Sequence, residues 1–311
     1  MLSRAAERVY WTGRYLERAE NTARLVQQYS QLLLDLPDEV GVGWPELVRI
    51  VGAMDAFRAS GKAETETGIL EFLLADTDGC TSLAYSLRMA RENIRNTRDL
   101  LPHEAWENVN ELYQEARRSL GPAASSEDRF EVLAECIGEC QKISGILSGT
   151  VSHHSPYHFL SLGKAIERAD MTSRIIEVAA AYIQHNERLV RRYGSSLWTN
   201  VLKSVSGFQM YRQFCQPQVQ GFRVIDFLLR DRAFPRSIAF CVDSARASAA
   251  ALPRGDRTIA ALDRADSLLQ PIAAEGLSAA QITELMDTVQ LRLGEAHHAV
   301  ATTWFLHEGA A

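Results

Sequence analysis

The sequence contains two copies of a charged pattern whose residue types could bind an anion or transfer a proton. Residues 13–26 read GRYLERAENTARLV, and residues 163–176 read GKAIERADMTSRII. A helix turns by about 100° per residue, so Arg14, Glu17 and Arg24 fall within an arc of roughly 80°. Guanidinium groups grip carboxylates and phosphates, and a glutamate can act as an acid or a base.

The two copies match in charge at an offset of 150 residues, and Lys164 takes the place of Arg14. A merely solvated helix face has no reason to keep the same charges at the same steps. We therefore expect the copies to face each other near the centre of the molecule, either as an internal salt-bridge network or as an open ligand site. The matching positions are Gly13/Gly163, Arg14/Lys164, Glu17/Glu167, Arg18/Arg168, Glu20/Asp170, Thr22/Thr172 and Arg24/Arg174.

A stripe of four arginines follows on a second segment, SLRMARENIRNTRDLL. Their spacing of 3, 4 and 3 residues keeps them within one arc of a helix, and no acidic residue falls inside that arc. Like charges one turn apart repel, so the stripe needs an anionic neighbour. That neighbour could be the acidic residues of the two copies, a phosphate or substrate carboxylate, or a partner protein. The arginines are Arg88, Arg91, Arg95 and Arg98, and the acidic candidates are Glu17, Glu20, Glu167 and Asp170.

The segment DRAFPRS, residues 231–237, reads as a helix end, a turn and a helix start. Pro235 suits the first turn of the next helix, whose exposed N–H groups can hold an anion. Arg236 and Ser237 would reinforce such an anion site. A well-capped helical hairpin without a ligand is the alternative.

Conventional catalytic and metal-binding motifs are missing from the sequence. It has no GxGxxG, P-loop, HExxH or GxSxG, and it lacks the two ExxH motifs that together mark a di-iron bundle. Its histidines lack metal-ligand partners at suitable spacings. The sequence therefore predicts neither a metal nor a cofactor. The five cysteines include no CxxC pair, and we expect them to be small buried residues in a reducing compartment.

Composition and charge limit the classes of partner. The chain has 311 residues, of which 46% are hydrophobic and 23% charged, enough for a large core. Its net charge of −6 disfavours binding to nucleic acid or to an anionic membrane. The first residues, MLSRAAERVYW, lack an apolar leader, and no apolar run is long enough to span a bilayer. We expect a cytoplasmic protein without a membrane segment.

The elements that must position these charges are helices. Glycine and proline are sparse, apolar residues recur every three or four positions, and no alternating strand is evident. The pattern predicts an all-α bundle of about 11–12 helices. The first helix is expected to run to about Leu36. The others are expected near 45–58, 64–75, 80–101, 103–120, 127–152, 157–190, 197–214, 217–230, 236–252, 257–271 and 278–306.

A second internal match supports a duplication. FLLADTDGCTSLAYSLRMAR (72–91) aligns with FLLRDRAFPRSIAFCVDSAR (227–246) at an offset of 155 residues. Because both matches occur in the same order, we expect a single domain, residues 1–311, built from two related halves. These halves cover about 1–152 and 153–311, and we expect them to pack with pseudo-twofold symmetry.

Four long segments resemble the signatures of the bacterial α-E domain family, and the resemblance extends from Met1 to the last helix. In order along the chain they are LSRAAERVYWTGRYLERAENTARL, ARENIRNTRDLLPHEAWENVNELY, YHFLSLGKAIERADMTSRI and FLLRDRAFPRSIAFC. Pro102 departs from the family pattern, where serine is more usual, which puts the local helix cap in doubt. The resemblance marks as typical Arg4, Glu7, Arg14, Glu17, Arg18, Glu20, Arg24, Arg91, Arg95, Arg98, Trp106, Asn110, Glu167, Arg168, Asp170, Arg174, Arg236 and Ser237.

The resemblance also implies a functional context. Genes of this family lie beside, or are fused to, those of circularly permuted ATP-grasp proteins, often together with a transglutaminase-like peptidase. ATP-grasp enzymes activate a carboxylate as an acyl phosphate and couple it to an amine. The resemblance thus implies a helical partner protein that contributes an Arg/Glu-lined site for an anionic small molecule or peptide to ATP-dependent peptide or amide formation or modification.

Two alternatives stay open. The protein could be an enzyme acting on a peptide or amino acid, with Glu17 or Glu167 as acid or base and arginines as carboxylate clamps, or it could be a structural scaffold. A glutamate flanked by arginines should have a lowered pKa, which favours the partner role. The candidate ligand-binding residues are Arg14, Glu17, Arg18, Glu20, Arg24, Arg88, Arg91, Arg95, Arg98, Glu167, Arg168, Asp170, Arg174, Arg236 and Ser237.

Overall fold

The computed structural model describes residues 1–37, 43–120, 126–185, 187–215, 217–269 and 277–306. The all-α prediction is confirmed, because this part of the chain holds fourteen α-helices, two short π-helical segments and no strand. The elements are α1 (Ser3–Asp35), α2 (Pro45–Ile50), α3 (Met54–Ala59), α4 (Glu66–Leu70), η2 (Glu71–Ala75), α5 (Leu83–Arg95), α6 (His103–Ser119), α7 (Ser126–Thr150), α8 (Ser155–His185), α9 (Glu187–Ser204), α10 (Phe208–Phe214), α11 (Gly221–Arg230), α12 (Ile238–Ala250), α13 (Asp256–Ser267), α14 (Ala279–Val300) and η4 (Ala301–Phe305).

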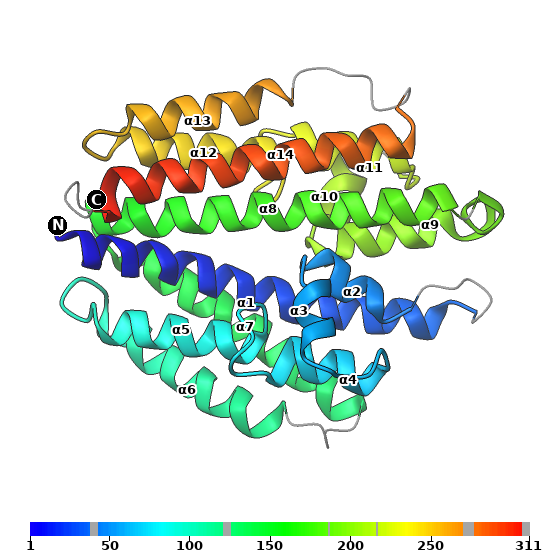
Figure 1. Cartoon of the computed structure of the whole chain (residues 1–311), viewed down its shortest axis with the longest axis horizontal. Helices are drawn as coiled ribbons and strands as arrows, with labels where there is room; N and C mark the ends of the chain where they lie inside the picture. Colours follow the sequence, from blue (N-terminus) through cyan, green and yellow to red (C-terminus); the bar gives the residue numbers. More distant parts are fainter. Residues whose placement is uncertain (38–42, 121–125, 186, 216, 270–276, 307–311) are drawn as a thin grey trace.

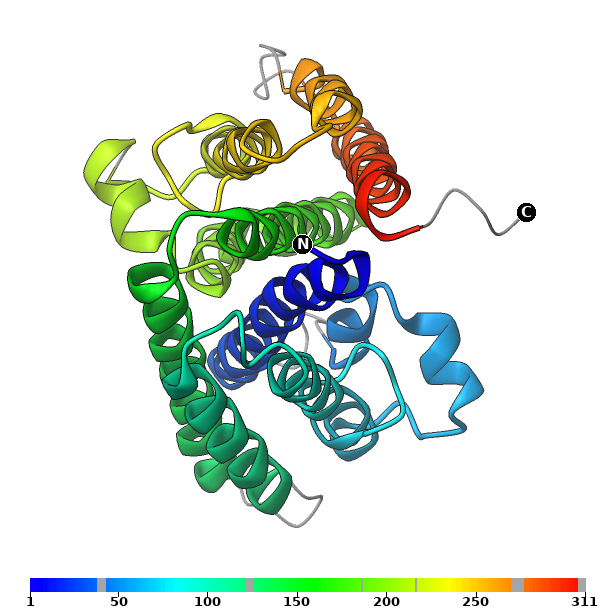
Figure 2. The ribbon, with the colours of Figure 1, turned by 90° about the vertical axis from the view of Figure 1, so that its left-hand side faces the viewer.

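Two long parallel helices, α1 and α8, form the centre of the molecule (Figure 1). Helices α5 and α7 pack against α1, and α6 packs on both of them. On the other side, α12 and α14 pack against α8, and α13 packs on both of those. Figure 2 shows these two groups end on, with α1 and α8 between them. The two charged copies of the sequence therefore lie on the two central helices.

The central helices are buried on more than one face. Val9, Leu16, Ala19 and Ala23 of α1 recur at helical spacing and are buried in the core. Glu17, on the charged face of the same helix, is also buried, at 2% exposure, because α8 covers that face. The charges of the repeated pattern thus lie inside the fold.

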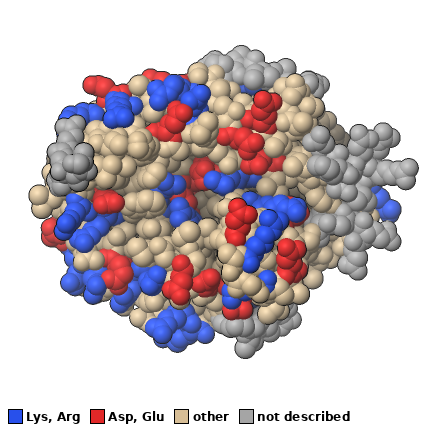
Figure 3. Space-filling model, viewed as in Figure 1, with Lys and Arg blue, Asp and Glu red and all other residues tan. Residues whose placement is uncertain are grey.

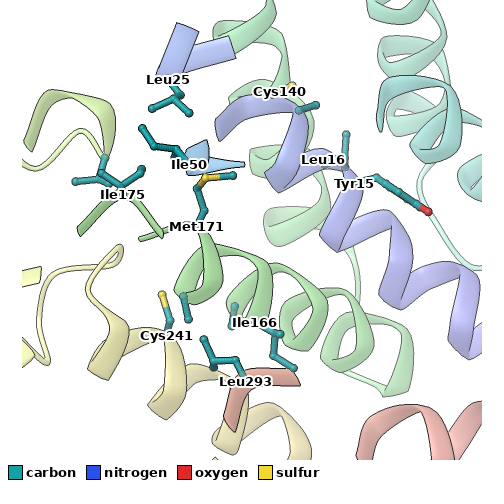
Figure 4. Packing of buried hydrophobic residues seen from close by; sticks show 14 of the residues in the cluster. Tyr15, Leu16, Leu25, Ile50, Cys140, Ile166, Met171, Ile175, Cys241 and Leu293 are labelled. Atoms are coloured by element: carbon teal, nitrogen blue, oxygen red, sulfur yellow. The ribbon is translucent and has the colours of Figure 1, made fainter. Parts of the chain in front are cut away.

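The apolar core continues from the central pair into the outer helices. Figure 4 shows Ile166 of α8 beside Leu293 of α14, and Met171 pointing from α8 towards Ile50 at the end of α2. All four side chains are buried. The core therefore fixes how α14 and α2 sit over the middle of α8.

The central helices touch at two glycines that match in the repeat. A Cβ atom added to Gly13 would lie 2.2 Å from the carbonyl oxygen of Leu160, and one added to Gly163 would lie 2.2 Å from the carbonyl oxygen of Tyr10. No side chain fits there, so glycine allows the two backbones to approach. This close contact holds the charged residues of the following turn of each helix opposite those of its partner.

Several expected element boundaries are wrong. The helix expected at 45–58 is two helices, α2 and α3, because Gly52 adopts a positive φ of 68° between them. The gap expected between the helices at 157–190 and 197–214 does not occur where predicted, since α9 continues through residues 191–196. The helix expected at 80–101 ends at Arg95, so Arg98 lies beyond α5. The count of fourteen exceeds the expected 11–12 because such segments are split.

The cysteine prediction is correct for three residues and wrong for two. Cys136, Cys140 and Cys241 are buried, whereas Cys80 and Cys215 are exposed. Cys80 lies in the turn before α5, and Cys215 caps the end of α10, so neither is on a helix face that packs. Within the described residues, no helix is both long and apolar enough to cross a bilayer.

Candidate functional site

The two Glu-Arg dipeptides of the repeat, at positions 17–18 and 167–168, exchange partners across the central helices. Arg168 donates Nε and Nη2 to the two carboxylate oxygens of Glu17, at 2.8 and 2.7 Å. Arg18 donates Nε and Nη2 to the two oxygens of Glu167, at 2.6 and 2.9 Å. Each glutamate is thus held by a two-pronged bond from the arginine of the other copy, the strongest geometry for this pair.

A second cation contacts each glutamate, and here the two sides differ. Arg236, from the turn before α12, donates Nη1 to Glu17 at 2.8 Å. Arg14, from α1 itself, donates Nε to Glu167 at 2.6 Å. The structure thus brings together Glu17, Glu167 and most of the arginines that the sequence marked on α1 and α8.

Both glutamates are ionised at neutral pH. Burial alone would raise the pKa of Glu167, but Arg14 and Arg18 outweigh burial and hold that pKa at about 2. Burial opposes ionisation of Glu17 in the same way, and Arg236 and Arg168 lower its pKa below the usual range. A carboxylate in this state is a poor proton acceptor near pH 7.

Arg236 closes the group of charges around Glu17. Its Nη1 also donates to Asn21 at 2.7 Å, and its Nη2 donates to Glu20 at 2.7 Å. Arg24 donates to Glu20 at 2.6 Å from one turn further along α1. We call this group the Glu17 cluster: Glu17, Glu20, Arg24, Lys164, Arg168 and Arg236.

The group of charges around Glu167 stays open on one side. Arg174 donates Nε to Asp170 at 2.9 Å, and at the matching positions of the other copy Arg24 donates Nη2 to Glu20. Beside these residues lies a cavity of about 320 Å³. We call the charges the Glu167 cluster: Glu167, Asp170, Arg14, Arg18 and Arg174. The Glu167 cavity is lined by Arg14, Arg18, Thr22, Val51, Thr81, Ile166, Glu167, Asp170, Met171, Arg174, Gln290, Leu293, Gly294 and His297.

The space-filling view shows a hollow between the two groups of helices on the face seen in Figure 1. Acidic and basic side chains lie together on the walls of this hollow (Figure 3). The cavity walls come from α1, α8 and α14, together with the ends of α2 and the turn before α5. Glu167 itself is as buried as Glu17, at 3% and 2% exposure, so a small molecule would reach the Glu167 cluster at Asp170 and Arg174, whose side chains are 23% and 29% exposed.

Two polar groups in the cavity wall have no counterpart in the sequence prediction. The hydroxyl of Thr22 is buried without a hydrogen-bond partner in the described part of the chain. His297 of α14 shares a 2.8 Å hydrogen bond between its Nδ1 and the hydroxyl of Tyr10. Burial, and then Arg14, lower the pKa of His297 to about 4, so its ring is neutral at pH 7. Thr22 entered the sequence analysis only as the match of Thr172, and no motif marks His297, because α14 meets α1 only in the folded chain.

A second cavity lies on the other side of the helix crossing. It measures about 220 Å³ and is lined by Lys164 and Arg168 together with the hydroxyls of four serines. Burial, and then Arg168, lower the pKa of Lys164, which makes no hydrogen bond or ion pair within the described residues. The serines are Ser144, Ser148, Ser161 and Ser244. Sequence analysis treated Lys164 only as the match of Arg14 and missed this cavity.

The prediction that the acidic residues of the two copies could face the arginine stripe is wrong. Arg91 donates to Asn110 of α6 at 2.7 Å, and Arg95 pairs with Glu92 of its own helix at 2.6 Å. Arg88 donates to the backbone of Thr77 at 2.9 Å. The stripe faces α6 and solvent, because the side of α5 that packs on α1 is the apolar one.

An aromatic ring also helps to stabilise the positive charge of the arginine stripe. The guanidinium carbons of Arg91 and Arg98 lie 5.2 and 5.6 Å from the ring centroid of Trp106. Such cation–π contacts attract a guanidinium group without an acidic residue. The family-typical residues Trp106 and Asn110 therefore hold the stripe, and a ligand role for its four arginines stays a prediction.

The turn at 231–237 is the capped hairpin of the second interpretation. Ser237 is the N-cap of α12 and accepts a bond from the N–H of Phe240 at 3.1 Å. Pro235 precedes the helix, instead of lying in its first turn, and its carbonyl accepts from Arg168 at 3.2 Å. Arg236 points to Glu17, away from the helix start, so these residues do not form the expected anion site.

The fold and the exchanged Glu-Arg pairs define a helical domain organised around this dipeptide. The Alpha-E family model, described as a predicted alpha-helical domain with a conserved ER motif, matches residues 1–305. The chain therefore belongs to the Alpha-E family. The exchanged pairs at 17–18 and 167–168 show what two of its Glu-Arg dipeptides do in the fold.

Relatives in mycobacteria are similar along nearly the whole chain. One protein of Mycobacterium bovis and one from each of two strains of Mycobacterium tuberculosis are 22% identical to it over 324 residues, and each is named only as uncharacterized. The match covers 95% of this chain but 36% of each relative, so the chain spans just over a third of their length. No solved structure matches the chain significantly.

Proposed function

We propose that the protein is the helical partner of an ATP-grasp ligase system and holds a carboxylate-bearing substrate, an amino acid or short peptide, in the Glu167 cavity. The observation that carries this proposal is the cavity itself, about 320 Å³ in volume, with three arginines in its wall. That volume lies at the lower end of the range for small-molecule sites. The reaction served would be ATP-dependent amide formation or modification.

The charge of the cavity wall supports an anionic group on the ligand. Three guanidinium groups face two carboxylates, and His297 is neutral at pH 7, so the wall has a net charge of +1. Arg14 donates Nε to Glu167, which directs the other end of its guanidinium to Tyr10 and the cavity. A guanidinium end is suited to a two-pronged bond with a carboxylate.

The state of the glutamates favours binding over acid–base catalysis. A general base needs a pKa near the working pH, whereas the pKa of Glu167 is about 2 and that of Glu17 is also lowered. A purely structural scaffold would have no need of an open, charged Glu167 cavity beside the Glu17 cluster, in which Arg236 fills the corresponding space. The enzyme and scaffold interpretations are therefore weaker than the partner role.

The partner itself is proposed from the family resemblance. In the mycobacterial relatives, a region like this chain makes up 36% of a longer polypeptide, so it occurs beside other segments. This arrangement suits a domain that hands a substrate to a neighbour. The proposed partners are the ATP-grasp protein and a transglutaminase-like peptidase.

The proposal is tested by calorimetric titration of amino acids and dipeptides into the wild type and Arg14→Lys. Lysine already occupies the matching position, 164, on α8, so we expect α1 to accept a lysine at position 14 without loss of structure. Loss of the guanidinium fork should weaken carboxylate binding at least about tenfold. The matched control, Lys164→Arg, should bind like the wild type. Addition of the wild type, but not Arg14→Lys, should increase ADP release by the ATP-grasp partner; equal effects would contradict the proposal.

A further inference from the structure

The turns that precede α5 and α12 are built alike. Ser82 and Ser237 are the N-caps of these helices and accept from the N–H three residues on, at 3.0 and 3.1 Å. Each serine hydroxyl also donates to the carbonyl six residues earlier, that of Asp76 or Asp231. The two turns thus correspond residue by residue.

Both turns are attached to the exchanged Glu-Arg pairs in the same way. Arg18 donates Nη1 to the carbonyl of Cys80 at 3.3 Å, and Arg168 donates Nη1 to that of Pro235 at 3.2 Å. The residue between each of these carbonyls and the capping serine is Thr81 in one turn and Arg236 in the other. Thr81 therefore holds the position that corresponds to Arg236.

The Glu167 cavity lies where a second Arg236 would be. The guanidinium of Arg236 binds three side chains of α1, which are Glu17, Glu20 and Asn21. At the offset of 150 residues, their matches on α8 are Glu167, Asp170 and Met171. All three matches line the cavity, and so does Thr81. The short threonine side chain leaves the space that a guanidinium fills in the other cluster.

Asp170 lacks the donors that its match receives. Glu20 accepts from Arg24, Arg236 and Gln141, and its side chain is 4% exposed. Asp170 accepts from Arg174 alone within the described residues, and its side chain is 23% exposed. A carboxylate offers about four acceptor positions, so Asp170 has capacity for a further donor.

A buried hydroxyl points to the same gap. Thr172 donates to the carbonyl of Arg236 at 3.0 Å. Its match, Thr22, lines the Glu167 cavity with a buried and unpartnered hydroxyl. A buried polar group without a partner is costly, and because a hydroxyl can also accept, a donor placed in the cavity would give the Thr22 oxygen a partner.

We infer that the Glu167 cavity binds a cationic group of its ligand, a guanidinium or an ammonium, in the position that Arg236 occupies in the Glu17 cluster. The cation contacts Asp170, Glu167 and the Thr22 hydroxyl. For the ligand as a whole, this inference rests on the proposed function, which supplies a carboxylate. Together they define the substrate class as zwitterions: amino acids or peptides with a free amino or guanidinium group.

The positive charge of the cavity wall does not oppose this assignment. The Glu17 cluster holds four basic groups against two carboxylates in a buried setting. The Glu167 cluster holds three basic groups against two. One bound cation makes the two clusters equal in charge, so the sister cluster shows that this fold accommodates such a balance.

The test is a substitution that supplies the missing group from the chain. Thr81→Arg should place a guanidinium in the cavity, as Arg236 does, while Thr81→Ser is the matched control. Titrations would use L-arginine, its methyl ester as a cation without a carboxylate, and N-acetylglycine as a carboxylate without a cation. We expect the wild type and Thr81→Ser to bind arginine and the ester, and Thr81→Arg to lose at least about tenfold in affinity with an unchanged or higher melting temperature.

The outcomes separate the two claims. Binding of N-acetylglycine but not of the methyl ester would overturn the inference and leave the proposed function standing. Binding of the ester but not of N-acetylglycine would support the inference and contradict the proposed carboxylate site. If Thr81→Arg is folded and binds arginine and the ester as the wild type does, or if neither cation binds the wild type, the inference is wrong.

Discussion

The charges around Glu17 and those around Glu167 come from matching positions of two parallel helices, yet a side chain from the neighbouring turn fills the space beside the carboxylates only around Glu17. In the Glu17 cluster, Arg236 enters from the turn before α12 and binds two carboxylates. In the Glu167 cluster, the corresponding turn carries Thr81, and a cavity of about 320 Å³ remains. The comparison teaches that the exchanged ion pairs build the frame, and that one shorter side chain leaves a cavity in half of it.

The largest effect should come from removing a charge in the closed cluster. Glu17→Gln keeps the shape but leaves Arg168 and Arg236 buried without their main counter-charge, which should cost about 3–5 kcal/mol of unfolding free energy. Glu167→Gln should cost less, because the open cavity lets water reach Arg14. Urea unfolding of both variants measures this difference. Equal losses would show that the two clusters are not different in kind.

The helix crossing offers a second, smaller effect. Gly13→Ala or Gly163→Ala would press a methyl group onto a carbonyl oxygen and separate α1 from α8, at a cost of about 1–3 kcal/mol. Gly145→Ala in α7, where no atom lies within 4 Å, should instead stabilise the protein by about 0.5–1 kcal/mol. Thermal melts distinguish the two classes. A neutral Gly13→Ala would mean that the helices do not touch there.

Between pH 5 and 7, the main pH dependence should come from His297 in the wall of the Glu167 cavity, with a smaller one from His158, whose pKa burial also lowers. The pKa of His297 in the folded protein is about 4, against an ordinary 6.5, so the unfolded chain binds this proton more readily. Stability from neutral His297 is therefore complete above pH 6.5 and is lost as the pH falls towards 4. The loss at pH 5 that His297 causes should be about 2 kcal/mol, and His297→Gln should remove this contribution.

The control for this pH dependence is the neighbouring residue. His298 is exposed, so His298→Gln should leave the dependence between pH 5 and 7 as in the wild type. Unfolding free energies at several pH values provide the measurement. A dependence that is as large in His297→Gln as in the wild type would place the titrating group elsewhere.

The smallest effect is expected at the arginine stripe. Arg95 pairs with Glu92 at the surface, and its side chain is 51% exposed, so Arg95→Ala should change stability by less than about 1 kcal/mol. It should also leave binding in the Glu167 cavity unchanged. Calorimetry on this variant checks both points. A loss of binding would show that the arginine stripe contributes to ligand binding.

Sequence reasoning reached the frame of the site but not its opening. The repeated Glu-Arg pattern predicted that the two copies face each other, and the bonds between Glu17 and Arg168 and between Glu167 and Arg18 confirm it. Spacing alone could not say which neighbour the stripe on α5 meets, because helical periodicity fixes a face and not its partner. That the two halves are related by duplication and by a pseudo-twofold axis stays a prediction.

The cavity escaped the sequence for a physical reason. The cavity exists because position 81 holds a threonine where the matching turn has Arg236. No sequence motif marks the lack of a large side chain. The cavity wall also includes His297, which lies 280 residues from Glu17 along the chain and reaches the site only because α14 packs on α8. The alignment of residues 72–91 with 227–246 contained the one available signal, since it pairs Thr81 with Arg236.

The central claim is that the Glu167 cavity binds the ligand and that the Glu17 cluster is structural. A crystal structure of the protein soaked with L-arginine tests it most directly. The account predicts the ligand in the Glu167 cavity, with a cationic group against Asp170 and the carboxylate near Arg14, and an unchanged Glu17 cluster. Arginine bound in the second cavity, which Lys164 and Arg168 line, or an empty Glu167 cavity in crystals of a protein that binds arginine in solution, would contradict it.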